Sequence, residues 1–429
     1  MDDRLDKNAR IADTQRATYE KRRSQVCRVF QMKIQSNKLT VNQREELRML
    51  FVEGKWCHNA ILASPSVSGY DTKPKSVVHK DKDGNDIETE YRYLPQSVRQ
   101  TIKKQIQDNL RVLSTRKKRG YKVGPLKFIS ELTSINFKQY GVTHKILSRN
   151  QIKLQGIKGC LKVNGLDQIY GNPDYEMANW KLLNLPDGYY VNITTYIDKD
   201  KVEKKKKIDK ILGIDFGCRT SFTTSEDEHL SFKVQEGERL KHLQRKLSRQ
   251  KKGSKRYERT KHLMRVEYQK IKNQKKDLAN KTVAHFVLYD KVVFQDEMLP
   301  LWHKSHFGKT VQHNILGRVK AELMKKDNVI VLSRSLPTTK FCSSCGKINH
   351  VKLCDESYKC SCGVYEDRDY HAAKNMVWFY ENNVGVGRTK FKRVEIHEAI
   401  DKAFADSVAV GSVKREADTL RVAVVHFKG

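Results

Sequence analysis

Two closely spaced pairs of cysteines lie between residues 342 and 362, and a glycine follows each pair directly. Each pair can place two thiolates on one side of a tight turn, and two such pairs complete a tetrahedron around Zn²⁺. Gly346 and Gly363 supply the permissive backbone that these turns use. Because four thiolates leave no open coordination position, we expect a structural site, with Cys354 left over. The predicted zinc ligands are Cys342, Cys345, Cys360 and Cys362.

Three carboxylates stand where predicted strands end or a predicted helix begins. Asp215 ends the apolar strand in GIDFG, Glu297 ends the strand KVVFQDE, and Asp369 starts the helical stretch DYHAAKNMVWFY. Acids at such positions are often turn or helix-cap residues. Their order, and the cysteine-rich insertion before the last of them, favour convergence at one edge of a sheet. Carboxylates of this kind bind Mg²⁺, and two such ions about 4 Å apart can hydrolyse a phosphodiester.

The elements before residue 210 alternate between helical and strand patterns. Residues 1–24 are predicted to be a frayed or weakly helical basic leader, and residues 26–34 have the period-two pattern of a half-buried strand. A helix should begin at the capping box formed by Thr40 and Gln43. After a polar loop with a turn at Asp83-Gly84, a second helix is expected from about residue 98. Strand patterns from 121 to 200 then predict a small β-barrel that the helices interrupt.

The second half of the chain reads as α/β. Buried strands are predicted around residues 209–216, 291–297 and 328–333, with a hairpin after the first strand and one helix over residues 308–326. Residues 235–288 are predicted to be helical and very basic, with a break near Gly253. The density of Lys and Arg there, with tyrosines between them, favours tracking of a phosphate backbone. The run KVEKKKKIDK before these elements is interpreted as a solvated linker.

The composition indicates a polyanionic partner. The 429 residues carry 84 Lys and Arg against 50 Asp and Glu, a formal net charge of +34. Phosphate contacts by such side chains release counterions and dominate affinity for nucleic acid. No apolar run is long enough to span a membrane, and the charged N-terminus excludes a secretory signal. We therefore expect a cytoplasmic protein whose nine cysteines are thiols or metal ligands.

Together the motifs GIDFG, QDE, FGKTVQHNILGRVKAEL, TTKFCSSCG, CSCG and DRDYHAAKN resemble a known family. They are similar to the RuvC nuclease half of TnpB proteins and of their descendants, the miniature type V-F CRISPR effectors. The resemblance is specific over residues 209–380 and looser over 25–208. It implies a prokaryotic RNA-guided DNA endonuclease with an RNase H-like (RuvC) domain, an inserted zinc ribbon and an N-terminal wedge-type β-barrel carrying a helical recognition lobe. The implied partners are a guide RNA and target DNA, with no membrane.

The resemblance also implies domain boundaries. They are a leader and first wedge strand (1–36), a helical lobe (37–120), the wedge barrel (121–200), a linker (201–208), RuvC motifs I and II (209–340), the zinc ribbon (341–364), and RuvC motif III with the C-terminal segment (365–429).

By motif position, the resemblance implies that Asp215, Glu297 and Asp369 are the catalytic acids, holding two Mg²⁺ ions, with Mn²⁺ as a substitute. Gln312 and Arg318 would contact the scissile strand. The family usually has Asn where this chain has His371. Both side chains can hydrogen-bond a neighbouring carboxylate or main-chain group, so activity is expected to survive the difference.

Other functional classes fit less of the sequence. A sugar-kinase or actin-like ATPase also has an Asp-x-Gly turn after its first strand, but the zinc ribbon and basic excess argue against it. An unguided transposase or integrase would use the same acids without RNA. A non-catalytic RNA-guided binder would be favoured only by a decayed triad, and all three acids are present. A CRISPR or a transposon origin, and a monomer or an asymmetric homodimer on one RNA, both stay open.

Overall fold

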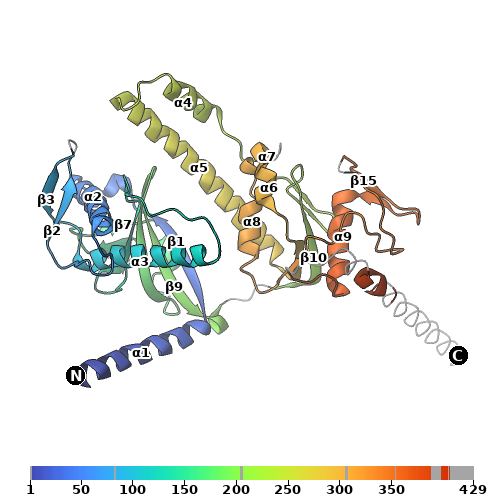
Figure 1. The fold of residues 1–429 in the computed structure, drawn as a ribbon, viewed down its shortest axis with the longest axis horizontal. Coiled ribbons are helices and arrows are strands. Elements are labelled where there is room, and N and C mark those ends of the chain that lie inside the picture. The colour runs from blue at the N-terminus through green and yellow to red at the C-terminus, as the bar shows by residue number, and fades with distance from the viewer. Residues whose placement is uncertain are drawn as a thin grey trace. The chain divides into compact units, whose positions relative to one another are not determined.

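The computed structural model describes residues 2–81, 84–202, 206–304, 308–352, 354–387, 398–403 and 405. By its contacts the chain divides into two compact units, Met1–Lys204 and Lys205–Gly429 (Figure 1). The boundary lies within the predicted linker. The predicted turn residue Asp83 lies outside the described residues, whereas Gly84 takes the left-handed φ of 91° that a turn glycine permits.

The first unit combines long helices with antiparallel sheets. One sheet has the strand order β1-β9-β8-β4 and a second has the order β5-β6-β7. An isolated bridge between Ile34 and Val163 joins the end of β1 to the segment after β7. The elements of the sheets are β1 (Gln25–Lys33), β4 (Ser134–Phe137), β5 (His144–Ser148), β6 (Gln151–Leu154), β7 (Leu161–Lys162), β8 (Glu176–Leu185) and β9 (Gly188–Asp198). The other elements are α1 (Asp2–Arg23), α2 (Val41–Ala63), the hairpin of β2 (Ser76–Lys80) and β3 (Asp86–Glu90), α3 (Gln96–Lys118), and 3₁₀ turns at Ser36–Lys38, Leu166–Gln168 and Lys199–Lys201.

Local sequence explains where these elements begin. Thr40 and Gln43 form the predicted capping box at the start of α2, each side chain bonding the other's main-chain N–H. One hydrophobic core runs through α2, α3 and the sheets and includes Leu47, Ile102 and Trp180. The helices α2 and α3 and the two sheets therefore pack around one core.

One prediction for the first unit needs correction. The segment expected to be a polar loop contains the β2–β3 hairpin, whose alternating residues pair in register from Ser76–Glu90 to Lys80–Asp86. The leader, expected to be frayed or weakly helical, is a 22-residue helix, α1, which confirms the helical alternative. Its last turn is held by Arg22, whose guanidinium lies 2.7 Å from a carboxylate oxygen of Glu176 on β8.

The second unit is built on a five-stranded mixed sheet of order β12-β11-β10-β13-β14. The strands β10, β13 and β14 run parallel, whereas β11 and β12 are antiparallel to their neighbours, as the predicted hairpin requires. The strands are β10 (Ile208–Phe216), β11 (Phe222–Thr224), β12 (His229–Leu230), β13 (Tyr289–Gln295) and β14 (Val329–Leu332). A separate hairpin follows, formed by β15 (Ser357–Lys359) and β16 (Tyr365–Asp367).

Helices cover both faces of this sheet, as Figure 1 shows around β10. Alternate residues of β13 contribute to two cores: Val292 and Phe294 pack with helices on one face, and Val293 packs with α9 residues on the other. The helices are α4 (Glu238–Ser248), α5 (Lys255–Phe286), α6 (Leu299–Lys304), α7 (Gly308–His313), α8 (Leu316–Leu323) and α9 (Arg368–Glu381).

The basic helical region has its predicted break, because Gly253 adopts a φ of 80° and Ser254 caps α5. By contrast, the single helix expected over 308–326 is divided into α7 and α8. Asn314 lies at the division and bonds the main-chain N–H of Ile315 through its own side chain. None of the helices in the described part of the chain combines the length and apolar character that a bilayer crossing requires.

Candidate metal centres

Asp215 stands at the edge of the sheet where two parallel strands end. Because β10 and β13 are parallel, with Gly213 opposite Val293, their carboxyl ends meet at the same edge. Close contacts explain why glycines occur two residues before and two residues after Asp215. A Cβ on Gly213 would lie 2.0 Å from the carbonyl oxygen of Ala373 in α9, so α9 can pack against β10 only at glycine. A Cβ on Gly217 would lie 2.4 Å from a main-chain oxygen in the turn that follows.

The three residues of the motif QDE, at the end of β13, have three different roles. Gln295 is buried, and its amide donates to the carbonyls of Ser333 (3.1 Å) and Leu336 (2.9 Å), which anchors the segment leading to the cysteines. Asp296 accepts from Lys320 through one oxygen (2.8 Å) and from Arg334 through the other (3.1 Å). Asp296 is therefore occupied as an ion-pair centre. Lys320 also donates to the main-chain carbonyl of Glu297 (2.5 Å), which leaves the Glu297 carboxylate as the acid to face the edge.

Asp369 reaches the same edge from the first turn of α9. Asp367 is the N-cap of that helix, since its Oδ1 accepts from the main-chain N–H groups of Asp369 (2.9 Å) and Tyr370 (2.8 Å). A carboxylate used as a cap is poorly placed to bind a metal ion. Asp369 points instead toward Gly217, whose Cβ position lies 3.8 Å from Asp369 Oδ2. Arg368 pairs with the other oxygen, Oδ1, at 3.0 Å.

Electrostatics tie the three acids together. Burial raises the pKa of Asp215 well above its ordinary value, and the negative charges of Asp369 and Glu297 raise it further. Burial also raises the pKa of Glu297. Two or more carboxylates that repel one another at one site are relieved by a bound divalent cation. The three acids are spaced more widely than the cysteines. Among the described residues, their carboxylate oxygens do not form a group in which all ligand atoms lie within 4.8 Å of one another. The donor set fits Mg²⁺ with room for water and phosphate oxygens.

The four predicted cysteines do form a tight cluster. Their sulfur atoms all lie within 4.8 Å of one another, with Cys342 to Cys362 at 3.6 Å and Cys345 to Cys360 at 3.5 Å. A tetrahedron with Zn–S bonds of about 2.3 Å requires sulfur separations near 3.8 Å, so the cluster fits zinc closely. The main-chain N–H of Cys362 lowers the pKa of Cys360 to about 6, which favours the thiolate that a metal needs. As predicted, Cys354 stands outside the cluster.

The two glycines that follow the cysteine pairs adopt the turn conformation predicted from the sequence. Gly346 and Gly363 have φ angles of 75° and 98°, and their N–H groups bond back to the carbonyls of Cys342 (2.8 Å) and Cys360 (3.0 Å). This left-handed conformation is one that glycine adopts without strain. The cysteine-rich segment, residues 341–364, is called the ribbon below.

The ribbon is fastened to the helix that carries Asp369. His371 is buried and its two ring nitrogens lie 2.6 Å from acceptors, the Glu366 carboxylate and the Phe341 carbonyl. Its ring stacks on Tyr358 of β15, with centroids 3.5 Å apart and planes 13° apart. Asn349 extends the connection, because its amide lies 2.6 Å from the Tyr358 hydroxyl and 3.3 Å from Cys360 Sγ. A continuous chain of contacts therefore joins a cysteine of the cluster to the first turn of α9.

The two predicted nucleic-acid contacts, Gln312 and Arg318, both line one cavity of about 440 Å³ in the second unit. Gln312 is exposed, and Arg318 is half-buried on α8. Its place in a cavity brings Arg318 together with lysines of α5, a grouping that the sequence did not indicate.

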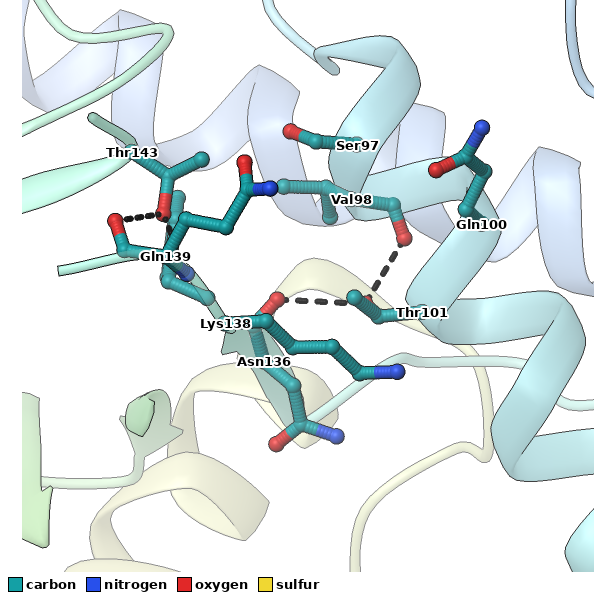
Figure 2. A pocket seen from close by; sticks show the side chains of 9 residues that line it. Ser97, Val98, Gln100, Thr101, Asn136, Lys138, Gln139 and Thr143 are labelled. Atoms are coloured by element: carbon teal, nitrogen blue, oxygen red, sulfur yellow. Dashed lines mark hydrogen bonds between the residues drawn. The ribbon is translucent and has the colours of Figure 1, made fainter. Parts of the chain in front are cut away.

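A smaller cavity of about 180 Å³ lies in the first unit, between α3 and the segment that contains β4 (Figure 2). Side-chain amides and hydroxyls dominate its lining. Thr101 Oγ1 lies 2.8 Å from the carbonyl of Val98 and 3.1 Å from that of Asn136, and Thr143 bonds the carbonyl of Gln139 at 3.0 Å. The sequence reasoning did not identify this cavity, because its walls come from segments far apart in the chain.

Parts of the chain are similar to families from mobile elements and to a domain of Cas12f1-like proteins. Residues 193–293 match the OrfB_IS605 family, described as "Probable transposase", and residues 318–376 match the family "Cas12f1-like, TNB domain". A mimivirus protein (Acanthamoeba polyphaga mimivirus) named "Putative transposase" is 27% identical over 189 residues, which are 38% of this chain and 39% of that protein. A Streptomyces pristinaespiralis protein named "Putative RNA-guided DNA endonuclease" is 24% identical over 177 residues, 39% of this chain and 44% of that protein.

Both curated relatives are matched over less than half of their own length. Among solved structures, the "Cryo-EM structure of the Cas12f1-sgRNA-target DNA complex" is similar with a TM-score of 0.38 and 13% identity, over 66% of this chain and 71% of that one. The two family matches and the Streptomyces relative confirm the resemblance expected from the sequence motifs.

Proposed function

Since the chain resembles TnpB proteins and miniature type V effectors, we propose that it is an RNA-guided DNA endonuclease with a RuvC-type active site. The observation that carries the proposal is the placement of the acids: Asp215 ends β10, Glu297 follows the parallel strand β13, and Asp369 in the first turn of α9 faces the turn after Asp215, with a cysteine ribbon inserted before this last acid. The strand order and directions of the second unit support an RNase H-like domain, because a three-stranded antiparallel segment is followed by two strands parallel to the first.

Asp215, Glu297 and Asp369 would hold the catalytic Mg²⁺ ions, with Mn²⁺ as a substitute. Bound there, such ions supply an activated water and stabilise the leaving oxygen of a phosphodiester. The protein's own contribution is orientation. Arg368 restrains one oxygen of Asp369, and Lys320 restrains the main chain at Glu297, so both acids are held before substrate arrives.

The ribbon would hold a structural Zn²⁺ through Cys342, Cys345, Cys360 and Cys362. The contacts of the ribbon with α9 explain why a metal-binding segment lies directly before Asp369. The hairpin of β15 and β16 ends at Asp367, the cap that sets the position of Asp369 two residues later. The zinc site would in this way hold one catalytic acid in place without taking part in the chemistry.

The partners in this proposal are a guide RNA and a target DNA. A net charge of +34 suits the many phosphates of an RNA scaffold and an RNA–DNA hybrid, while base pairing supplies sequence specificity. The first unit would correspond to the wedge barrel (1–36 and 121–200) with its helical lobe (37–120). The second would contain RuvC motifs I and II (209–340), the ribbon (341–364) and motif III (365–429). Either a monomer or an asymmetric homodimer on one RNA fits these assignments.

A second candidate function is an unguided transposase of a mobile element. The match of residues 193–293 to a family described as "Probable transposase" favours it. Both functions would use the same acids, so the acid triad does not separate them. They differ in whether a defined RNA directs the protein to its DNA.

The nuclease assignment is tested by DNA cleavage with matched acid variants. Asp215→Ala is expected to abolish cleavage while RNA binding persists. Replacement of Asp290, a half-buried acid at the start of β13 that pairs with Lys207, by Ala should leave cleavage normal. Cys345→Ser should loosen the ribbon and impair cleavage without touching the triad. Cleavage by Asp215→Ala at the wild-type rate would contradict the active-site assignment.

A further inference from the structure

The turn between β10 and β11, residues 217–221, lies beside two of the three acids. It begins two residues after Asp215, and a hydrogen bond from the Gly217 N–H to the Ser221 carbonyl (3.3 Å) joins its two ends. Asp369 Oδ2 lies 3.8 Å from the position that a Cβ on Gly217 would take. The placement of this turn therefore affects how the Asp215 and Asp369 carboxylates lie relative to each other.

Ser221 fixes the far end of the turn through its side chain. The residue is 1% exposed, and its Oγ accepts from the main-chain N–H of Phe232 (2.9 Å) and from the side-chain amide of Asn314 (2.9 Å). Asn314 is 6% exposed, and its own Oδ1 accepts from the N–H of Ile315 at 2.7 Å. Only the oxygen of an amide can accept from an N–H, so this bond directs the Asn314 nitrogen toward Ser221.

The segment that carries Asn314, between α7 and α8, is itself held from several directions. Lys275 of α5 donates to the Gln312 carbonyl. The N–H of Val234, after β12, donates to the His313 carbonyl at 3.0 Å. The next helix, α8, packs beside α5 (Figure 1). Asn314 therefore extends to the turn from a support that does not depend on β10 or β11.

We propose that Asn314 is a positioning residue for the metal-binding acids, because through Ser221 it fixes the turn that lies beside Asp215 and Asp369. The inference rests on the proposed nuclease function, which gives these acids their role. The two carboxylates repel each other before a cation binds. A link from outside the hairpin resists the separation that this repulsion favours. Groups that orient metal ligands without contacting the metal affect metal affinity strongly.

A second asparagine in the same unit offers a matched control. The Asn328 amide donates to the Tyr289 carbonyl at 2.8 Å, at the start of β13 and so at the sheet edge opposite the acids. Replacing either asparagine by Ala removes an amide that joins two segments of the unit. Only Asn314 is linked to the turn beside the acids, so a general loss of stability would affect the two variants alike.

Titration of the zinc-loaded, full-length protein with Mn²⁺ measures the effect, with free Mn²⁺ followed by electron paramagnetic resonance. Binding elsewhere, including binding to co-purified RNA, is subtracted with Asp215→Ala, which lacks the site. Asn314→Ala should weaken the Asp215-dependent binding of Mn²⁺ by about tenfold, the lower end of the cost of losing a group that orients a metal ligand. Asn328→Ala should bind Mn²⁺ as the wild type does.

Ser221→Ala tests the route and breaks the same link from its other side, so the test stands even if Asn314→Ala folds poorly. Each single variant is expected to lose about tenfold in Mn²⁺ affinity. The double variant should also lose about tenfold, because both changes remove one interaction. A loss of about a hundredfold in the double variant, the result for independent effects, would show that Asn314 does not act through Ser221.

Three results would overturn the positioning role: wild-type Mn²⁺ affinity in Asn314→Ala, equal losses in Asn314→Ala and Asn328→Ala, or no Mn²⁺ binding that depends on Asp215. The titration is independent of cleavage. If Mn²⁺ binding changes as expected but target DNA is never cleaved, the positioning role stands and the nuclease function fails. If target DNA is cleaved but Asn314→Ala keeps its Mn²⁺ affinity, the nuclease stands and the positioning role is refuted.

Discussion

Replacement of His371 tests whether the ribbon and α9 form one mechanical unit. The imidazole is 1% exposed, bridges Glu366 and the Phe341 carbonyl, and stacks on Tyr358. His371→Ala removes all three interactions. Both acceptors still have a hydrogen-bond donor, however, because Glu366 keeps Lys374 at 2.7 Å and the Phe341 carbonyl keeps the Asn375 amide at 2.7 Å.

The expected cost follows from these contacts. A hydrogen bond to a carboxylate contributes about 1.5–3 kcal/mol, and a stacked aromatic pair adds roughly 0.5–1.5 kcal/mol. Because both acceptors retain a partner, we expect a loss near the middle of the summed range, about 3 kcal/mol. For a unit of this size that corresponds to a fall in melting temperature of roughly 10 °C. His371→Asn can keep one of the two hydrogen bonds and should recover about half of the loss.

Thermal unfolding of the zinc-loaded protein measures the loss, and the rate of zinc release to a chromogenic chelator shows where it falls. Release should be faster in His371→Ala, because the Tyr358 side of the ribbon loses its support. His285→Ala is the control: His285 also pairs with a glutamate, Glu228 at 2.9 Å, but is 40% exposed, and its loss should cost less than about 1 kcal/mol. If the two variants lose equal stability, or zinc release from His371→Ala is unchanged, the ribbon is not held by this histidine.

Three further predictions concern other parts of the structure. Gly213→Ala should destabilise the second unit by at least about 3 kcal/mol, because the added Cβ would lie 2.0 Å from the carbonyl oxygen of Ala373; unfolding in urea measures this. About 10 mM Mg²⁺ should raise the melting temperature of the wild type but not of Asp215→Asn, because the ion relieves the repulsion that raises the pKa of Asp215. Arg22 is the main cause that lowers the pKa of Glu176 to about 2, so Glu176→Gln should lose under about 1 kcal/mol at pH 7. That difference should vanish as pH falls from about 4.5 to about 2.

Each of these predictions has a control in the same measurement. Gly124→Ala should be nearly neutral, since a Cβ there meets nothing within 4 Å. Asp277→Asn should keep the Mg²⁺ response, because Asp277 pairs with a lysine on α5 rather than facing the sheet edge. For Glu176, a stability difference that stays constant from pH 7 to pH 2 would show that the charge of the carboxylate is not what stabilises α1 against β8.

Local chemistry made part of the structure predictable. The spacing of the cysteine pairs and their glycines predicts the four-cysteine cluster, and Thr40 and Gln43 define the start of α2 through contacts three residues apart. The run of apolar residues before Asp215 indicates a buried strand for the same reason. In each case the interactions that decide the structure lie within a few residues.

Long-range contacts decide what the sequence could not reveal. The three roles of QDE depend on Lys320 and Arg334, which come from α8 and from the segment after β14. The helix expected over 308–326 is divided at Asn314, whose amide bonds Ser221, 93 residues away. Nothing around His371 in the sequence indicates that it faces the Phe341 carbonyl rather than Asp215, Glu297 or Asp369.

The central claim is that an RNA directs this protein to DNA. The most direct measurement is to express the protein with its native flanking DNA, purify it, and sequence the RNA that survives nuclease treatment of the complex. We predict one defined scaffold RNA joined to a variable segment, and the scaffold would also distinguish a CRISPR array from a transposon end. Recovery of no RNA, or of random fragments only, would contradict RNA guidance and favour the unguided transposase.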